Sequence, residues 1–560
     1  MTPEHVDAVV VGSGFGGSVS AYRLTEAGQR VVVLERGRAY PPGSFPRTPA
    51  DMGRAFWDPG AGLHGMFDVW TFRGFDSIVS SGLGGGSLIY ANVLLRKDER
   101  WFVHEDPLPG GGYETWPVSR ADLEPHYDAV EKMLTPARYP FDAPAYSDTP
   151  KTHAMRLAAK NLGLDWQLPP LAVSFAPRPG AEPAIGLPIV EPEYGNLHGA
   201  TRRTCRLCGE CDIGCNDGAK NSLDHNYLSA AAAGGRHGGA DIRTRSEVIG
   251  LRVRDGGGYE VTYVEHRDGS RSNTRKMPTR TITCDRLVLA AGTYGTTYLL
   301  LRNRQGLPGL SDALGSRFSG NGDLLTFLLP ERGTALRRSM EASRGPVITS
   351  AIRVGDAKDG DSGRGYYIED GGYPGFTDWL VESADHTRML FRAAEFVTRW
   401  VLTLLRQMPD NRLGQEISQL IGDGTLSAGS LPLLGMGRDV PDGVMRLDGD
   451  LLDVEWTTET SKEFFGRIRE TMKQIAGELD ARYLDNPIWF FKRIITVHPL
   501  GGAPMGRHPG EGVCDAYGQV FGQPGLYIAD GAAMPGPVGA NPSLTIAALA
   551  DRMCTRLLNG

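Results

Sequence analysis

Residues 6–37 constrain what this chain can fold into more than any other stretch. Residues 6–11 form a run rich in β-branched side chains, residues 18–27 have helical spacing with Tyr22 and Leu24 on the apolar face, and residues 31–34 are again apolar. A stretch that changes from strand-like to helical periodicity and back predicts a strand, a helix and a second strand. These residues are therefore expected to form one βαβ unit.

A glycine-rich turn joins the first strand to the helix and contains Gly12, Gly14, Phe15, Gly16 and Gly17. In this G-x-G-x-x-G pattern the first glycine permits a tight turn, the second lets backbone N–H groups approach a pyrophosphate, and the third lets the helix pack closely on the strand. Glu35 follows at the tip of the second strand, where a carboxylate accepts hydrogen bonds from ribose and repels a 2′-phosphate. The turn predicts a dinucleotide site, and the alternative is a structural turn without a ligand.

The length and composition are those of a folded protein with more than one domain. A chain of 560 residues suggests two or more domains, and 41% hydrophobic with 22% charged residues is ordinary for a globular protein. The formal charge of −7 is spread along the chain without long runs of one sign, which argues against a nucleic-acid-binding surface.

Two further stretches have the pattern of the first turn. A second glycine-rich loop opens a short helix and contains Gly82, Gly85, Gly86 and Ser87. Its backbone is suited either to lie against a cofactor or to form a plain structural turn. Residues 285–301 indicate a buried strand, a turn at Gly292 and a helix, which is a second crossover of the same kind.

The remaining segments predict how the chain is divided. Residues 324–453 contain alternating runs that suit an antiparallel sheet with helices on one side, and a helix is expected to follow Ser119 as its N-cap. We assign residues 1–100, 200–325 and 490–560 to a discontinuous nucleotide-binding domain. Residues 101–199 and 326–489 are assigned to a substrate-binding domain.

Several motifs of the chain resemble those of the glucose-methanol-choline (GMC) flavoprotein oxidoreductases. The resemblance covers nearly the whole chain and is most specific at residues 6–37, 82–87, 219–231, 287–292, 315–325, 498–502 and 525–545. Within the family, the chain looks most like the bacterial cholesterol oxidases with non-covalent FAD. The resemblance implies an α/β fold in which a Rossmann-like FAD-binding domain is joined to a substrate domain with a mainly antiparallel sheet.

The resemblance also implies where FAD lies. Glu35 is expected on the adenosine ribose, Val248 near the adenine and Asp530 on the ribityl chain, and Ile89 stands where some relatives carry a flavin-linked histidine. The other positions expected to contact FAD are Gly12, Gly14, Phe15, Gly16, Gly17, Gly82, Gly85, Gly86, Ser87, Gly292, Gly531, Asn541 and Pro542.

The implied reaction is oxidation of an alcohol by hydride transfer to flavin. It requires an acceptor for the hydroxyl proton and a donor for the charge that develops on the reduced flavin. His498 and Asn541 match the family's pair beside the flavin ring. The alternatives are a structural histidine, and an asparagine that caps the helix expected to start at Pro542; the asparagine can do both, with its backbone capping the helix while its amide faces the flavin.

Glu369 matches the position of a buried glutamate that takes the substrate proton and supports double-bond isomerisation in cholesterol oxidases. The alternative is a solvated acid at the end of a strand, in a turn with Asp370 and Gly371. A useful base here needs its pKa tuned by burial.

Four of the seven cysteines lie within eleven positions, at Cys205, Cys208, Cys211 and Cys215. Their spacing is that of iron–sulfur ligands in ferredoxins, although Asn216 replaces the usual proline. Four such thiolates can also hold zinc, form a disulfide or remain unligated. Secreted cholesterol oxidases lack this insertion, so the cysteines are where the chain departs from that pattern.

The sequence therefore predicts an FAD enzyme that oxidises a secondary alcohol on a hydrophobic, steroid- or terpenoid-like substrate to a ketone, with molecular oxygen or an electron carrier as acceptor. The alternatives are a dehydrogenase that uses an iron–sulfur cluster, a ketone desaturase or reductase, and a flavoprotein that only relays electrons. Residues 1–11 leave no room for a secretory signal, and residues 389–405 suit an amphipathic helix over the pocket or in the core rather than a membrane span. A cytoplasmic protein with at most peripheral membrane contact is expected.

Overall fold

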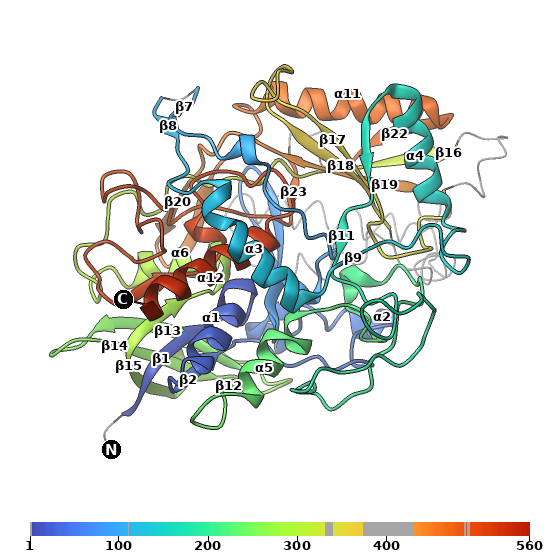
Figure 1. Ribbon diagram of the computed structural model, residues 1–560. Coiled ribbons are helices and arrows are strands. Elements are labelled where there is room, and N and C mark those ends of the chain that lie inside the picture. Colours follow the sequence, from blue (N-terminus) through green and yellow to red (C-terminus); the bar gives the residue numbers. More distant parts are fainter. Residues whose placement is uncertain are drawn as a thin grey trace.

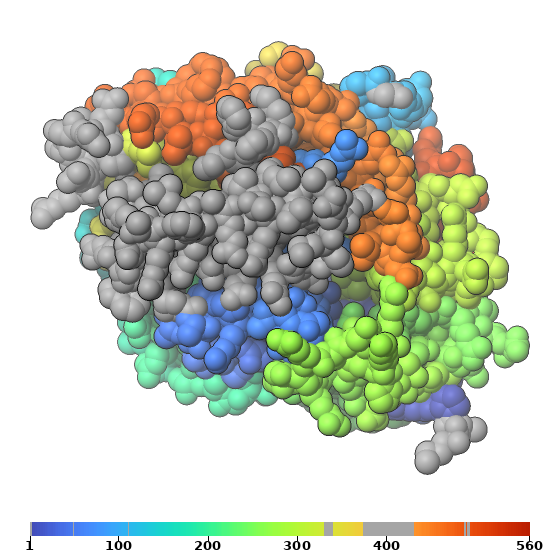
Figure 2. Space-filling view, turned by 180° about the vertical axis from the view of Figure 1, so that it is seen from behind, coloured from blue at the N-terminus to red at the C-terminus, as the bar shows by residue number. Residues whose placement is uncertain are grey.

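The computed structural model describes residues 3–109, 111–330, 340–372, 430–486, 489 and 493–559. The amphipathic helix predicted over residues 389–405 lies outside the described residues. Two large β-sheets organise the described part, one in the lower half of Figure 1 and the other at the upper right. Figure 2 shows the molecule from behind, with orange atoms of residues 444–478 above green atoms of residues 246–289.

The first sheet has seven strands and contains the predicted βαβ unit. Its strands are β1 (Glu4–Val11), β2 (Val31–Leu34), β12 (Asp241–Arg243), β13 (Ser246–Val253), β14 (Tyr259–Glu265), β15 (Thr279–Leu289) and β24 (Leu526–Ile528). The order is β12-β2-β1-β15-β14-β13, and β24 pairs with the end of β15. The pairs among β12, β2, β1, β15 and β24 are parallel, whereas β14 and β13 add an antiparallel edge.

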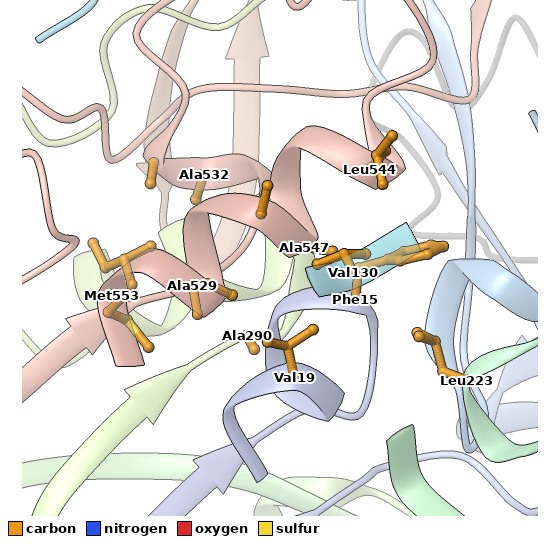
Figure 3. Close-up of a cluster of buried hydrophobic side chains, with 14 of the residues drawn as sticks. Phe15, Val19, Val130, Leu223, Ala290, Ala529, Ala532, Leu544, Ala547 and Met553 are labelled. Atoms are coloured by element: carbon orange, nitrogen blue, oxygen red, sulfur yellow. The ribbon is translucent and has the colours of Figure 1, made fainter. Parts of the chain in front are cut away.

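Five helices belong to this half of the molecule, and two of them, α1 and α6, contact strands of the sheet. The five are α1 (Phe15–Glu26), α3 (Arg120–Leu134), α5 (Tyr227–Ala233), α6 (Gly292–Arg302) and α12 (Ser543–Asn559). Helix α1 contacts α5 and α12, and α12 contacts α3. Figure 3 shows where they meet, with Val19 of α1 close to Ala290 and Phe15 beside Ala547 of α12. The predicted N-cap of α3 is confirmed, because Ser119 and Asp122 form a reciprocal capping box.

The second sheet has six strands, all antiparallel. In order they are β10 (Asp165–Gln167), β17 (Ala351–Val354), β18 (Tyr366–Asp370), β19 (Leu431–Gly437), β16 (Leu324–Pro330) and β22 (Ala481–Asp485). Helix α11 (Lys462–Glu478) contacts β18, β22 and α4 (Pro150–Leu162), and its apolar side chains form a core with Ile368 of β18. Tyr367 belongs to the core of the first sheet instead. Because successive side chains of a strand point to opposite faces, Glu369 shares the Tyr367 face.

Short elements complete the described part. They are α2 (Pro49–Met52), β3 (Trp57–Asp58), β4 (Leu63–His64), β5 (Phe67–Thr71), β6 (Asp76–Ser80), β7 (Asp106–Pro107), β8 (Tyr113–Glu114), β9 (Ala137–Arg138), β11 (Pro170–Leu171), β20 (Val444–Asp448), β21 (Leu451–Glu455) and β23 (Ile495–Thr496). Within the ranges given above, no helix is both long enough and apolar enough to cross a membrane.

The predicted α/β fold, with a Rossmann-like sheet and a separate antiparallel sheet, is confirmed. Strand β16 of the second sheet crosses the proposed division between residues 325 and 326, and the domain boundaries stay a prediction. Helix α4 lies within residues 136–199, where the sequence is rich in proline and shows little periodicity, so no helix was predicted there.

Three backbone segments touch beneath the first glycine turn. Gly12 has a positive φ of 95°, and a Cβ there would lie 2.2 Å from the carbonyl oxygen of Ala290. A Cβ on Gly16 would lie 1.6 Å from the carbonyl oxygen of Ala529, and one on Gly17 would lie 2.0 Å from that of Gly12. The turn, the end of β15 and the end of β24 therefore pack without room for side chains.

We predict that Gly16→Ala lowers the free energy of unfolding of the apoprotein by about 3 kcal/mol or more, because a backbone carbonyl cannot move aside cheaply. Gly14→Ala is the matched control, since a Cβ there meets nothing within 4 Å. It should change that free energy by less than about 1 kcal/mol. Denaturant unfolding of both variants measures the difference, and equal stabilities would contradict the packing described here.

Candidate cofactor and catalytic site

Two glycine-rich loops meet at the carboxyl ends of the parallel strands. A Cβ on Gly85, in the 3-10 helix η2 (Gly85–Leu88), would lie 2.6 Å from the Cα of Gly14. A Cβ on Gly14, Gly86 or Gly292 would meet no atom within 4 Å, so these three glycines face open space. The first N–H groups of α1 have no partner within the helix, and such an end attracts phosphate.

The other glycines and polar groups of these loops hold the loops together. Gly82 packs against Tyr40 and Leu88. The Ser87 hydroxyl donates to the Gly84 carbonyl at 2.7 Å and accepts from the Leu223 N–H at 3.0 Å. Of the predicted cofactor contacts in these loops, Gly14 and Gly86 have an open side.

The side chain of Phe15 is placed differently from a cofactor contact. It is buried in the cluster around α12, as Figure 3 shows, and lies edge-on to Tyr90 with ring centroids 5.5 Å apart. The backbone N–H of Phe15, in the first turn of α1, is the part that remains for a phosphate.

Glu35 is buried at the end of β2 and its carboxylate faces the first loop. One oxygen accepts from the N–H and the hydroxyl of Ser13, at 3.1 and 2.6 Å, and the other accepts from the Gly37 N–H at 2.8 Å. The Glu35 carbonyl accepts from the N–H of Ser246, two residues before the buried Val248. Glu35 and Val248 therefore lie at the same end of the sheet, and their contacts with ribose and adenine stay predictions.

Asp530 ties the carboxy-terminal loop to the second crossover. Its carboxylate accepts from the Gly292 N–H at 2.9 Å, the Thr296 hydroxyl at 2.5 Å and the Ala532 N–H at 2.9 Å. Burial raises the pKa of Asp530 to about 6, against the lowering effect of these bonds.

Gly531 packs against Thr293. The Pro542 carbonyl accepts from the Ile546 N–H in the first turn of α12. Contacts of Asp530, Gly531 and Pro542 with FAD stay predictions.

Asn92 is a candidate that the sequence analysis missed. It follows the second glycine-rich loop, is fully buried, and has a left-handed backbone with φ of 72°. Neither its amide nitrogen nor its amide oxygen has a hydrogen-bond partner in the described chain. A buried unpaired amide is costly, so its partner is expected from a bound group. Together with the open sides of Gly14, Gly86 and Gly292, it fits a bound dinucleotide.

His498 follows β23 and is oriented by a buried carboxylate. Its Nδ1 lies 2.7 Å from Oδ1 of Asp323, and its backbone N–H donates to Oδ2 of the same residue at 3.1 Å. An ionised carboxylate only accepts, so Nδ1 carries a proton and the neutral ring keeps its lone pair on Nε2. Asp323 lies within the motif 315–325, but its role was not predicted, because sequence does not show that the two segments meet.

Asn541 and Glu369 form a second buried pair. The Asn541 amide donates to Oε2 of Glu369 at 3.3 Å, whereas Oε1 of Glu369 and Oδ1 of Asn541 have no partner in the described chain. The pKa of Glu369 is raised to about 8, chiefly by burial and also by the negative charges of Asp370 and Asp323, against the lowering effect of the bond from Asn541. The carboxyl group is therefore mostly protonated at pH 7.

These contacts bear on two of the alternatives that the sequence left open. Glu369 is fully buried and not a solvated acid, so that alternative is wrong. Asn541 uses its amide on Glu369, and its Oδ1 has no bond to the first turn of α12, which begins at Ser543. One turn connects the two pairs, because Asp323 contacts His498 and the Asn321 amide donates to the carbonyl of Ala540, which directly precedes Asn541.

The cysteine segment lies against the second glycine loop. The Lys220 ammonium donates to the carbonyls of Leu88 and Cys211, at 3.0 and 2.8 Å. Cys205, Cys208, Cys211 and Cys215 are free thiols, and no three of their sulfur atoms lie within 4.8 Å of one another. That arrangement is not a closed tetrahedral zinc site. Iron–sulfur ligation by these cysteines stays a prediction.

Among the described residues, one group of three side chains of the kinds that bind metals does come together. Atoms of His198, Asp224 and His225 lie within 4.8 Å of one another. His198 Nε2 and Asp224 Oδ2 are 2.7 Å apart, so a hydrogen bond accounts for their approach.

Comparison with known proteins shows which family models and which characterised enzymes this chain resembles. A family model described as GMC oxidoreductase matches residues 439–550, and one described as an NAD(P)-binding Rossmann-like domain matches residues 10–45. A cholesterol oxidase of Mycobacterium tuberculosis is 32% identical over 99% of this chain and 91% of its own length. A cholesterol oxidase of Acinetobacter baumannii is 29% identical over 98% of this chain and 93% of its own, and a 6'''-hydroxyparomomycin C oxidase of Streptomyces lividus is 26% identical over 98% and 90%.

We predict that Asn92→Gly weakens FAD binding by about tenfold to a hundredfold, because one or two buried hydrogen bonds to the cofactor are lost. Glycine adopts the same positive φ, and the deleted amide has no partner in the described chain, so the free energy of unfolding of the apoprotein should fall by less than about 1 kcal/mol. Titration of apoprotein with FAD, followed by flavin fluorescence, measures the affinity. An unchanged affinity would remove Asn92 from the cofactor site.

Proposed function

This chain belongs to the GMC oxidoreductase family, and on that premise we propose that it oxidises a secondary alcohol on a hydrophobic, steroid- or terpenoid-like molecule to a ketone. The family, the fold and the FAD-dependent class of enzyme predicted from the sequence are confirmed. The kind of alcohol, the electron acceptor and the catalytic roles below are proposals.

The observation that carries the proposal is the pair of unpartnered atoms on Glu369 and Asn541, which the turn of residues 319–323 connects to the Asp323–His498 pair. FAD, when bound, supplies the acceptor of a hydride at flavin N5. His498 takes the proton of the substrate hydroxyl on Nε2, since Nδ1 is held by Asp323. The free Oδ1 of Asn541 and Oε1 of Glu369 are available to orient the polar end of the substrate without a charge at neutral pH.

Glu369 is suited to a second proton transfer. A buried carboxyl with a pKa near 8 releases and takes up a proton close to neutrality, as movement of a double bond next to a new ketone requires. It lies on the face of β18 that is turned to the core of the first sheet. This position supports the isomerisation role implied by the resemblance.

A hydrophobic substrate is supported by similarity to two cholesterol oxidases over nearly the whole chain. Other relatives bear names with different alcohols, including a 2-methyl-1,2-propanediol dehydrogenase that is 23% identical. A sterol is therefore the first substrate class to test and a small diol the second. A cytoplasmic location remains the prediction made from the sequence.

A second candidate function is a dehydrogenase that passes electrons through an iron–sulfur cluster to a carrier. Lys220 supports it, because this ammonium bridges the cysteine segment and the loop that faces the cofactor space. With a cluster, electrons from FAD leave one at a time, and oxygen is a poor acceptor. Without one, molecular oxygen is the proposed acceptor.

Anaerobic stopped-flow absorbance tests the main proposal. We expect a hydrophobic secondary alcohol such as a 3-hydroxysteroid to bleach the flavin faster than a long-chain primary alcohol or a small diol. Bleaching by no alcohol would favour electron relay, and bleaching by the diol alone would refute the hydrophobic substrate. Reoxidation by oxygen identifies the acceptor, while iron analysis and the visible spectrum of anaerobically purified protein decide whether a cluster is present.

We predict that Glu369→Gln slows the isomerisation that follows flavin reduction by about two orders of magnitude, because its base is lost while the shape and the bond from Asn541 are kept. In the unsubstituted protein the step that needs the carboxylate should accelerate as pH rises through about 8 and level off above it. Glu369→Gln should abolish that rise. Rates from pH 6 to pH 10 check this, and an unchanged profile would exclude Glu369 as the base.

A further inference from the structure

The turn formed by residues 319–323 lies between the two segments that carry the proposed catalytic side chains. The Asn321 amide nitrogen donates to the Ala540 carbonyl at 3.0 Å, and its amide oxygen accepts from the Gly539 N–H at 2.8 Å. These bonds clamp the backbone directly before Asn541. Asn321 is fully buried, so water does not compete for these two hydrogen bonds.

Two residues further on, Asp323 clamps the segment that carries His498. Besides the bond from Nδ1, its carboxylate accepts from the Thr496 hydroxyl at 2.9 Å and from the N–H groups of Val497 and His498 at 2.8 and 3.1 Å. Asp323 is also fully buried. Four donors on one carboxylate define its orientation, and therefore the orientation of the imidazole.

The turn itself is anchored to the second sheet. Asp439, just after β19, accepts from the Ser319 hydroxyl at 2.5 Å and from the Gly320 N–H at 3.0 Å. The Asn321 carbonyl accepts from the Gly437 N–H at 2.9 Å. Asn321 has a left-handed φ of 54°, a conformation that asparagine adopts more readily than most other residues.

We propose that Asn321 and Asp323 are the positioning residues of this active site, and that their turn sets Asn541 and His498 relative to each other across the two sheets. Asn321 acts through the 539–540 backbone to hold the Asn541 amide on Glu369. Asp323 keeps the proton on Nδ1 of His498, so that Nε2 is the atom free to accept a proton. The inference deepens the proposed function and rests on its assignment of His498 and Asn541.

The test is a pair of double-mutant cycles measured by flavin reduction. Asn321→Gly removes both amide bonds while keeping the left-handed backbone. Asp323→Asn keeps the size of the side chain but has one acceptor oxygen, which the three donors to Oδ2 require, so its NH2 group faces Nδ1 and cannot accept the Nδ1 proton. We expect each to slow reduction about tenfold to a hundredfold in the unsubstituted protein. In an Asn541→Ala background, Asn321→Gly should lower the rate of flavin reduction by less than about threefold. In a His498→Gln background, Asp323→Asn should lower that rate by less than about threefold. Additive effects would overturn the proposal.

A pH profile separates positioning from general damage. Asn541, Asp370 and Asp323 are the groups that act on the Glu369 carboxyl, and the bond from Asn541 lowers its pKa. Loss of that bond in Asn321→Gly should move the alkaline rise, in the rate of the step that needs the Glu369 carboxylate, to higher pH. Asn541→Ala should cause the same shift, and the double variant should shift the rise no further. An unshifted profile in Asn321→Gly would refute its role, as would equal shifts that add.

A readout without turnover keeps this inference distinct from the proposed function. Histidine-selective ¹⁵N NMR, with His498 assigned by His498→Gln, should show a protonated Nδ1 that is lost or exchanging in Asp323→Asn. If Asn321→Gly does not retain FAD, Asn321→Asp preserves the backbone and the acceptor for Gly539 and takes its place in the cycle. A tautomer that Asp323→Asn leaves unaltered overturns the proposal, whereas a panel of alcohols that never bleaches the flavin overturns only the proposed function.

Discussion

Backbone contact beneath the first glycine turn is the constraint on which the rest of this molecule depends. Gly12 and Gly16 touch the carbonyls of Ala290 and Ala529 without room for a Cβ. Three segments far apart in the chain are thereby held at van der Waals distance. Since Ala529 immediately precedes Asp530 and the loop to Asn541, this contact also brings the carboxy-terminal loop to the cofactor space.

The chemistry of the site arises from incomplete pairing of buried polar groups. Asp323 is fully satisfied by four donors and serves to orient, whereas Glu369 receives one long bond and keeps a free oxygen. Burial without pairing is what raises the pKa of a carboxyl toward neutrality. The two carboxyl groups thus acquire different roles from their surroundings, although both are fully buried.

Much of the fold was predictable because it follows from local pattern. The βαβ unit, the cap at Ser119 and the antiparallel second sheet all rest on periodicity or turn chemistry, which neighbouring residues determine. Helix α4 was missed because the stretch that contains it is rich in proline and shows little periodicity. In the site, His498, Asn541 and Glu369 were indicated by family motifs. Asp323 and Asn92 were not, because a contact with a segment 175 residues away, or an amide left without a partner, cannot be seen along the chain.

The sequence by itself determined that this chain builds a dinucleotide fold of the GMC type, since spaced glycines, strand runs and short motifs act through their immediate neighbours. Tertiary structure alone decided that Glu369 is buried and not solvated, that Asn541 binds it instead of capping a helix, and that one turn holds both catalytic segments. The physical reason is that burial, pairing and the resulting pKa depend on atoms brought together from distant parts of the chain, and no local pattern records which of them will meet.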